Sequence, residues 1–141
     1  MRFLIPIAAL ALAACSTEEV SAPDVAEALP TGTYSGGGRD ALCVTAAAGG
    51  QRAGFVVYGA DDENCSARGT IAPQGLTWTL TPQGDADCRI PLSLNDGRIV
   101  LGPGTPTCGY YCGPGVTFAG TSFRRDTNTR TVTDFAGDAL C

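Results

Sequence analysis

The chain has 141 residues, of which nine are arginine and none is lysine or histidine, against 14 aspartates and glutamates, so its formal net charge at pH 7 is −5. A chain without histidine and lysine cannot by itself form a Ser-His-Asp triad, a Cys-His pair, a lysine Schiff base or a histidine-ligated zinc site. Its acidic balance also argues against nucleic acid as a partner. We therefore predict no catalytic residue, no metal site and no cofactor.

Residues 1–14 have the composition of a secretory signal peptide, with Arg2 followed by the apolar run 3–12 and two alanines before Cys15. The motif "LAAC" at residues 12–15 resembles the lipobox of bacterial type II signal peptides. This resemblance implies cleavage before Cys15 and acylation of Cys15, for example with palmitate, so that the lipid bilayer becomes a partner of the chain. Ser16 in the next position implies the outer membrane, with the domain facing the periplasm; the inner membrane is the alternative. An ordinary signal peptide, which would leave Cys15 as a free thiol, is the competing interpretation.

Residues 15–30 are predicted to be a lipidated cysteine and a flexible tether. Alanine, serine, proline and acidic residues dominate this stretch, and it has no strand alternation. Fifteen coil residues have a typical end-to-end distance of about 20 Å. Cleavage would remove Arg2, leaving eight arginines against 14 carboxylates, or a charge of −6.

Residues 31–141 are predicted to form a single β domain, since apolar residues there recur with a period of two. In "GLTWTLT", residues 75–81, Leu76, Trp78 and Leu80 share one face. Turn signals rich in glycine, proline and aspartate separate the candidate strands. Seven to eight short strands predict an all-β protein, a small antiparallel barrel or sandwich stabilised by disulfides. The predicted strands are Thr33–Gly36, Ala41–Ala46, Ala53–Tyr58, Cys65–Ala72, 75–81, 88–94, Arg98–Leu101 and Thr129–Phe135, whereas residues 113–125 also fit a short helix.

With Cys15 assigned to the lipid, the other cysteines form an even set in an oxidising compartment, which favours three disulfides. Fifteen pairings are open. In "CGYYCGPG", residues 108–115, the two cysteines either bond each other or reach separate partners, and we favour separate partners. A thioredoxin-like redox pair would need two intervening residues and a βαβ unit. The disulfide candidates are Cys43, Cys65, Cys88, Cys108, Cys112 and Cys141.

Two acidic clusters stand out. Asp85 and Asp87 would lie on one face of a strand, about 7 Å apart, as glycosidase carboxylates do, but an exposed acidic turn is the simpler interpretation. Residues 61–64, "DDEN", lack the regular alternation of a calcium loop and are expected to be solvated. We expect a partner, if there is one, to contact Asp61, Asp62, Glu63, Tyr110 and Tyr111.

Arg124 and Arg125 adjoin Asp126. They are expected to form internal salt bridges with Asp126 and Asp134; the alternative is contact with the phosphates of lipopolysaccharide, because guanidinium binds phosphate in a bidentate manner.

Three classes of function follow. The first is an envelope lipoprotein that acts as a non-catalytic binding or structural module. The second is an inhibitor of a cationic cell-wall hydrolase, because in layout the chain resembles the membrane-bound lysozyme-inhibitor lipoproteins, which are small disulfide-containing β-barrels on a lipidated tether. It carries no convincing copy of their inhibitory loop motif. The mature domain also resembles small bacterial lipoproteins without an assigned function. The third class is a hydrolase that uses Asp85 and Asp87.

Overall fold

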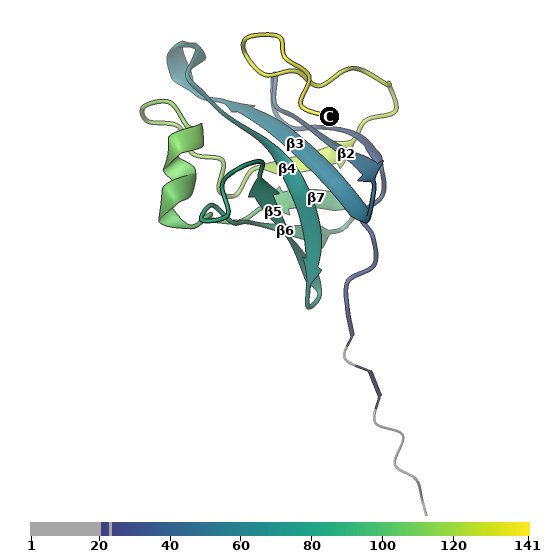
Figure 1. Cartoon of the computed structure of the whole chain (residues 1–141). Helices are drawn as coiled ribbons and strands as arrows, with labels where there is room; N and C mark the ends of the chain where they lie inside the picture. Colours follow the sequence, from purple (N-terminus) through teal and green to yellow (C-terminus); the bar gives the residue numbers. More distant parts are fainter. Residues whose placement is uncertain (1–20, 23) are drawn as a thin grey trace, which may run out of the picture.

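A computed structural model describes residues 21, 22 and 24–141, so the predicted signal peptide and Cys15 lie outside the described residues. The described chain forms a closed antiparallel barrel in which each strand pairs with the next and β8 pairs with β1 (Figure 1). The all-β prediction is confirmed, and of the two architectures left open the chain adopts the barrel. The strands are β1 Gly32–Ser35, β2 Ala41–Ala47, β3 Gly50–Tyr58, β4 Asn64–Gln74, β5 Thr77–Pro82, β6 Ile90–Asn95, β7 Arg98–Leu101 and β8 Ser122–Arg125.

Two short 3-10 helices interrupt the loops. The first, η1, spans Ala60–Asp62 between β3 and β4, and the second, η2, spans Pro106–Tyr111 between β7 and β8. No helix in the described part of the chain is long and apolar enough to cross a membrane.

Most strand predictions are confirmed to within a few residues, with one exception. Residues 129–135 do not form a strand; they make only the isolated bridge Thr133↔Ala139. The strand that closes the barrel is instead β8, within the stretch that the sequence left ambiguous. The prediction failed because residues 126–141 fold back as a loop over the outside of the barrel. Val132 and Leu140 in this loop are buried against β2 and β3, which gives them a strand-like apolar pattern without strand pairing.

The barrel interior holds the main core. Alternate strand residues point inward, and the largest fully buried side chains include Tyr34, Phe55 and Phe123. Trp78 and Leu80 are buried as their alternation predicts, but Leu76 is 72% exposed because it lies in the turn before β5. The residues of the core cluster come from positions 29 to 123 of the chain, and the disulfide cysteines from positions 43 to 141. Residues 29–141 therefore contain both the core and the cross-links of the domain.

The cysteines form three disulfides, Cys43–Cys141, Cys65–Cys112 and Cys88–Cys108. Cys108 and Cys112 therefore reach separate partners, as favoured from the sequence. The last two bonds attach η2 to the barrel: Cys108 lies inside η2 and Cys112 follows it directly.

The segment before β1, residues 24–31, lies along one end of the barrel. The Ala26 N–H donates to the Gly75 carbonyl at 2.7 Å, in the turn between β4 and β5. Leu29 is buried, and the Gln51 side chain bonds both its N–H and its carbonyl, at 2.9 and 2.7 Å. Part of the predicted tether, residues 26–30, is thus packed on the barrel. Figure 1 shows the chain leaving from this end.

Candidate functional site

The predicted contact residues lie on two neighbouring loops. Asp61, Asp62 and Glu63 belong to the β3–β4 connection, and Tyr110 and Tyr111 end η2. We call these five residues the acid-tyrosine surface.

Three links hold these loops together. The Cys65–Cys112 disulfide joins β4 to the end of η2. The Gly113 N–H donates to the Asn64 carbonyl at 2.8 Å. The Glu63 carboxylate packs against Gly113: a Cβ at position 113 would lie 2.1 Å from Glu63 Oε2, so a larger residue there would displace the Glu63 side chain.

The acidic loop has a constrained backbone. Asp61 and Asp62 both have positive φ, 56° and 59°, a region that L residues other than asparagine and aspartate seldom enter. The Asp62 carboxylate forms an ion pair with Arg39, whose guanidinium lies 4.0 Å from the centre of the Tyr58 ring. Arg39 was not singled out in the sequence, and its role depends on the β1–β2 hairpin lying beside η1.

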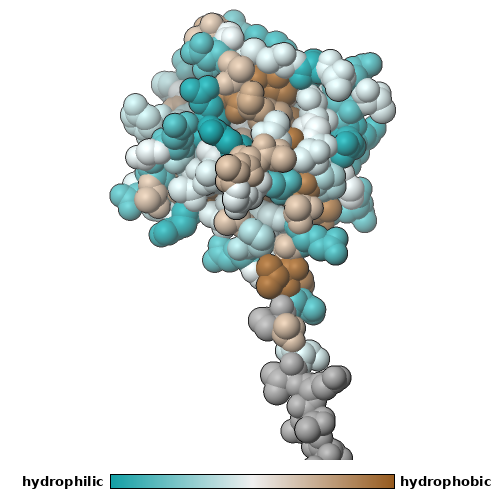
Figure 2. All heavy atoms as spheres, turned by 45° about the vertical axis from the view of Figure 1, so that its right-hand side comes forward, coloured by the Kyte–Doolittle hydropathy of each residue, from teal (hydrophilic) through white to brown (hydrophobic). Residues whose placement is uncertain are grey.

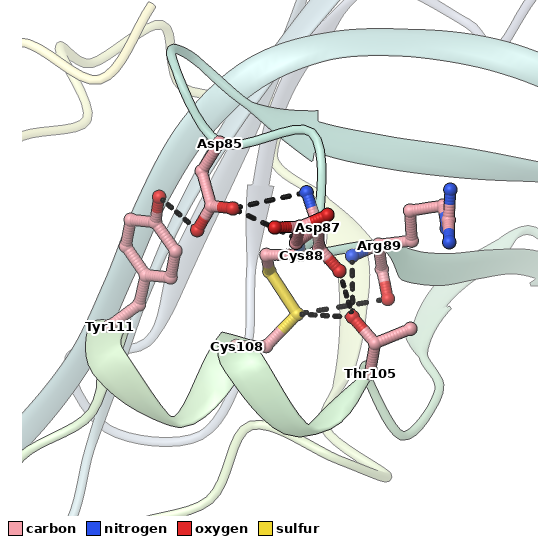
Figure 3. The surroundings of a disulfide bond; sticks show 7 residues. All are labelled: Asp85, Asp87, Cys88, Arg89, Thr105, Cys108 and Tyr111. Carbon is pink, nitrogen blue, oxygen red and sulfur yellow. Dashed lines mark hydrogen bonds between the residues drawn. A yellow bond between two sulfur atoms is a disulfide. The ribbon is translucent and has the colours of Figure 1, made fainter.

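The two tyrosines have different surroundings. Tyr110 is 87% exposed, and its ring meets that of Tyr111 edge-on at 5.4 Å between centroids. The Tyr111 hydroxyl donates to Asp85 Oδ2 at 3.1 Å (Figure 3). Burial, and then the hydrogen bond to the Asp85 carboxylate, raise the pKa of Tyr111, so the hydroxyl stays protonated as a donor.

Asp85 organises the loop between β5 and β6. Its other oxygen, Oδ1, accepts from the N–H groups of Asp87 and Cys88, both at 3.1 Å. Through these bonds Asp85 connects the β5–β6 loop, at Cys88 of the Cys88–Cys108 disulfide, to Tyr111 at the end of η2, as Figure 3 shows. Asp85 and Asp87 lie in the turn between β5 and β6, as the simpler interpretation of the sequence expected, and not on one face of a strand.

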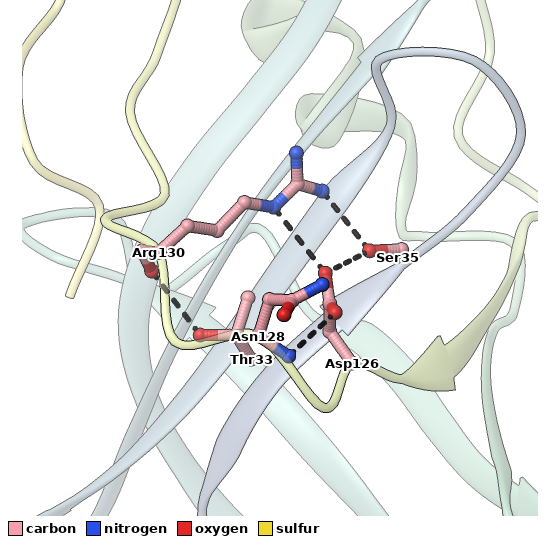
Figure 4. A network of polar contacts seen from close by, with 5 residues as sticks. All are labelled: Thr33, Ser35, Asp126, Asn128 and Arg130. Carbon is pink, nitrogen blue, oxygen red and sulfur yellow. Dashed lines mark hydrogen bonds and ion pairs between the residues drawn. The ribbon is translucent and has the colours of Figure 1, made fainter.

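Asp126 forms an ion pair with Arg130. The sequence predicts a pair with Arg124 or Arg125 instead, and that prediction is wrong. The Asp126 Oδ2 accepts from the Ser35 hydroxyl at 2.6 Å and lies 3.6 Å from Arg130 Nε (Figure 4). The Ser35 hydroxyl, then the Asn128 N–H and the Arg130 charge lower the pKa of Asp126. The expected salt bridges are absent among the described residues, because the Arg125 guanidinium donates to the Thr31 carbonyl at 2.8 Å instead.

Within the described residues, no group of three or more histidine, cysteine, aspartate or glutamate side chains is arranged to hold a metal ion. Comparison with known proteins finds no matching family model, no matching curated protein and no matching solved structure. Any assignment of function therefore depends on the residues and contacts described above.

Proposed function

We propose that this protein is a lipid-anchored envelope lipoprotein whose barrel acts as a non-catalytic binding module. The observation that carries the proposal is the contact between Ala26 and Gly75, because an anchor on Cys15 would then lie near this end of the barrel. Only the ten residues 16–25 separate Cys15 from Ala26, and such a coil has a typical span of about 17 Å. An acyl chain on Cys15 would keep the β4–β5 turn close to the bilayer.

The surface at that end is compatible with a bilayer. Val25 and Leu76 are 59% and 72% exposed, and Figure 2 shows a hydrophobic patch where the N-terminal segment joins the barrel. Apolar side chains of this kind are stabilised at a lipid interface.

The acid-tyrosine surface would then be directed away from the membrane. Strand β4 has eleven residues, about 35 Å along the strand, and it separates η1 from the β4–β5 turn. Exposed Tyr110 offers a large aromatic surface on the loop that the Cys65–Cys112 disulfide joins to the acidic β3–β4 connection. An aromatic ring combined with carboxylates suits a cationic protein partner. An inhibitor of a cationic cell-wall hydrolase such as lysozyme is the specific form of this proposal.

Anchoring is tested by labelling cells with radioactive palmitate and following the wild-type chain and Cys15→Ala. We expect label on the wild type only, and its recovery in the outer-membrane fraction. An unlabelled wild type would overturn the anchor.

Partner binding is tested by placing a photo-crosslinking amino acid at position 110 in intact cells. We expect a crosslinked cationic protein, and we expect the yield to fall in Asp61→Asn. Asparagine tolerates positive φ, so this variant removes charge without changing the backbone. Asp96→Asn is the matched control, because Asp96 also has positive φ, 50°, but lies in the β6–β7 turn. An equal loss in the control would contradict a role for the acid-tyrosine surface.

A turbidity assay with lysozyme and the chain from Ser16 tests the inhibitor. Protection of cell walls at micromolar protein supports it. Lack of protection removes lysozyme as the partner, and the crosslinked species then defines the target.

A further inference from the structure

Two arginines face each other on the outside of the barrel where β7, β8 and β1 meet. Arg98 lies directly opposite Arg124 in the β7–β8 ladder, and Arg124 lies opposite Ser35 in the β8–β1 ladder. Because Ile99 and Phe123 point into the core, the side chains of Arg98 and Arg124 must point outward. Directly opposed residues in an antiparallel pair have Cα atoms about 4.5–5.5 Å apart.

This arrangement is unfavourable without a counterion. Like charges that lie directly opposite one another in a sheet destabilise it. Among the described residues the ion pairs are Arg39–Asp62 and Arg130–Asp126, so neither Arg98 nor Arg124 has a carboxylate within 4.0 Å. Residues 24–141 contain more carboxylates than arginines, and within this range the pair still has no ion-pair partner.

The pair lines an open groove together with Ser35, Ser122 and Thr127; we call these five residues the arginine groove. Asp126 also borders it. The Asp126 carboxylate already interacts with the Ser35 hydroxyl, the Asn128 N–H and Arg130, and the charge of Arg130 offsets its own. Arg125, at the same groove, is held by the Thr31 carbonyl.

We propose that Arg98 and Arg124 bind a phosphate group in this groove. Guanidinium presents planar paired donors that match phosphate oxygens in a bidentate manner. Two such groups on adjacent strands can hold one phosphate between them, and the hydroxyls of Ser122 and Thr127 supply further donors. A bound phosphate would relieve the repulsion between the arginines. The site does not depend on the proposed partner surface or on the lipid anchor.

The site is tested by titrating inorganic phosphate into the ¹⁵N-labelled chain from Ser16, with chloride adjusted to constant ionic strength. We expect saturable shifts at the amides of Ser122 and Arg124 and at the Arg98 side-chain Nε. Since a hydrogen bond to a charged group contributes strongly to binding, Arg98→Gln and Arg124→Gln should each weaken binding by about tenfold or more.

Two further variants separate geometry from charge. Arg124→Lys keeps the charge but loses the paired donors, so we expect weaker binding than in the wild type. Arg89→Gln removes one charge from an exposed side chain that lies outside the groove, and it should bind as the wild type does. Unsaturable shifts count against a free-phosphate ligand, and an equal loss in Arg89→Gln would overturn the site.

The source of the phosphate is distinguished with vesicles. If the site takes a lipid headgroup, the chain should bind phosphatidylglycerol vesicles in an Arg98-dependent manner. If it takes a free phosphate, only the soluble anion should bind. Either result supports the site, and failure of both arms overturns it without affecting the test of Cys15.

Discussion

The indole N–H of Trp78 donates a hydrogen bond of 2.9 Å to the carbonyl of Glu27. This contact joins β5 to a residue 51 positions earlier in the chain. Together with the Ala26–Gly75 bond it decides where the N-terminal segment leaves the barrel.

Trp78→Phe should loosen this attachment while keeping an aromatic ring in the core. Loss of one hydrogen bond of this kind lowers the free energy of unfolding by about 1 kcal/mol. A protease that cleaves after glutamate should then cut at Glu27 faster than in the wild type. Thr81→Val, on the outer face of the same strand, should leave the cleavage rate unchanged. Equal rates in all three proteins would show that Trp78 does not hold the segment.

Gly69→Ala should be among the most damaging substitutions in the barrel. A Cβ at Gly69 would lie 1.9 Å from the carbonyl oxygen of Thr81, so β4 and β5 would have to separate. We expect a loss of about 3 kcal/mol or more in the free energy of unfolding, measured by urea denaturation. Gly50→Ala is the control, because the nearest atom to its Cβ is 4.0 Å away, and it should change stability little. Similar urea midpoints for the two variants would contradict the close approach.

Ser35→Ala should raise the pKa of Asp126 toward its ordinary value of 3.8, because the Ser35 hydroxyl is the main cause of the lowered pKa. The sign follows from linkage: a carboxyl with a lowered folded pKa stabilises the fold above its ordinary pKa, and this contribution is lost as pH falls through the folded value. The ¹³C shift of the Asp126 carboxyl, followed against pH, measures the change. Ser93→Ala on β6 should leave that titration unaltered, and no difference between the two variants would exclude the Ser35 contact as the cause.

Tyr111→Phe should remove the alkaline sensitivity of the η2 loop. The folded pKa of Tyr111 is raised above its ordinary 10.0, so its contribution to stability is present below pH 10.0 and is lost as pH rises through the folded value. At neutral pH the variant should lose about 1 kcal/mol of unfolding free energy. Urea midpoints measured at neutral and alkaline pH should therefore converge between wild type and variant. Tyr110→Phe should behave as the wild type, and a constant gap at all pH values would contradict ionisation of Tyr111.

Removing the Cys43–Cys141 disulfide, by Cys43→Ala with Cys141→Ala, should cost more stability than removing Cys88–Cys108. The sequence separations are 98 and 20 residues. In the chain-entropy model these loops correspond to about 5 and about 3 kcal/mol of unfolding free energy. The first variant should also expose Val132 and Leu140, detectable as faster amide exchange in residues 130–140. The reverse order of stability would indicate that loop closure is not the main contribution.

Much of the barrel was predictable because alternation directly reports which side of a sheet a residue occupies. Trp78 and Leu80 were assigned to the core on this ground, and they are buried. The same rule failed for Val132, because this side chain packs with Leu140 on the outside of β2 and β3 without strand pairing. Apolar residues that recur with a period of two indicate that one side of a segment is buried. They do not distinguish a strand from a loop that lies on a sheet.

The candidate sites were harder to predict from the sequence than the barrel, because they depend on the register in which the strands pair. The cysteine pairing, the contact of Tyr111 with Asp85 and the opposition of Arg98 and Arg124 each join positions from different strands or loops. Residue types alone contain no information on which strand position faces which. The clustering of Asp61, Asp62 and Glu63 was visible only because these residues are adjacent in the chain.

The three disulfides are nested, each enclosing the next: Cys43–Cys141 encloses Cys65–Cys112, which encloses Cys88–Cys108. A protease that cuts the backbone at any point between Cys43 and Cys141 therefore leaves two fragments that are still covalently joined. A nicked molecule would keep its mass on a non-reducing gel and separate only after reduction. After a protease cuts an exposed loop in this range, both fragments of the domain therefore stay attached to the N-terminal segment.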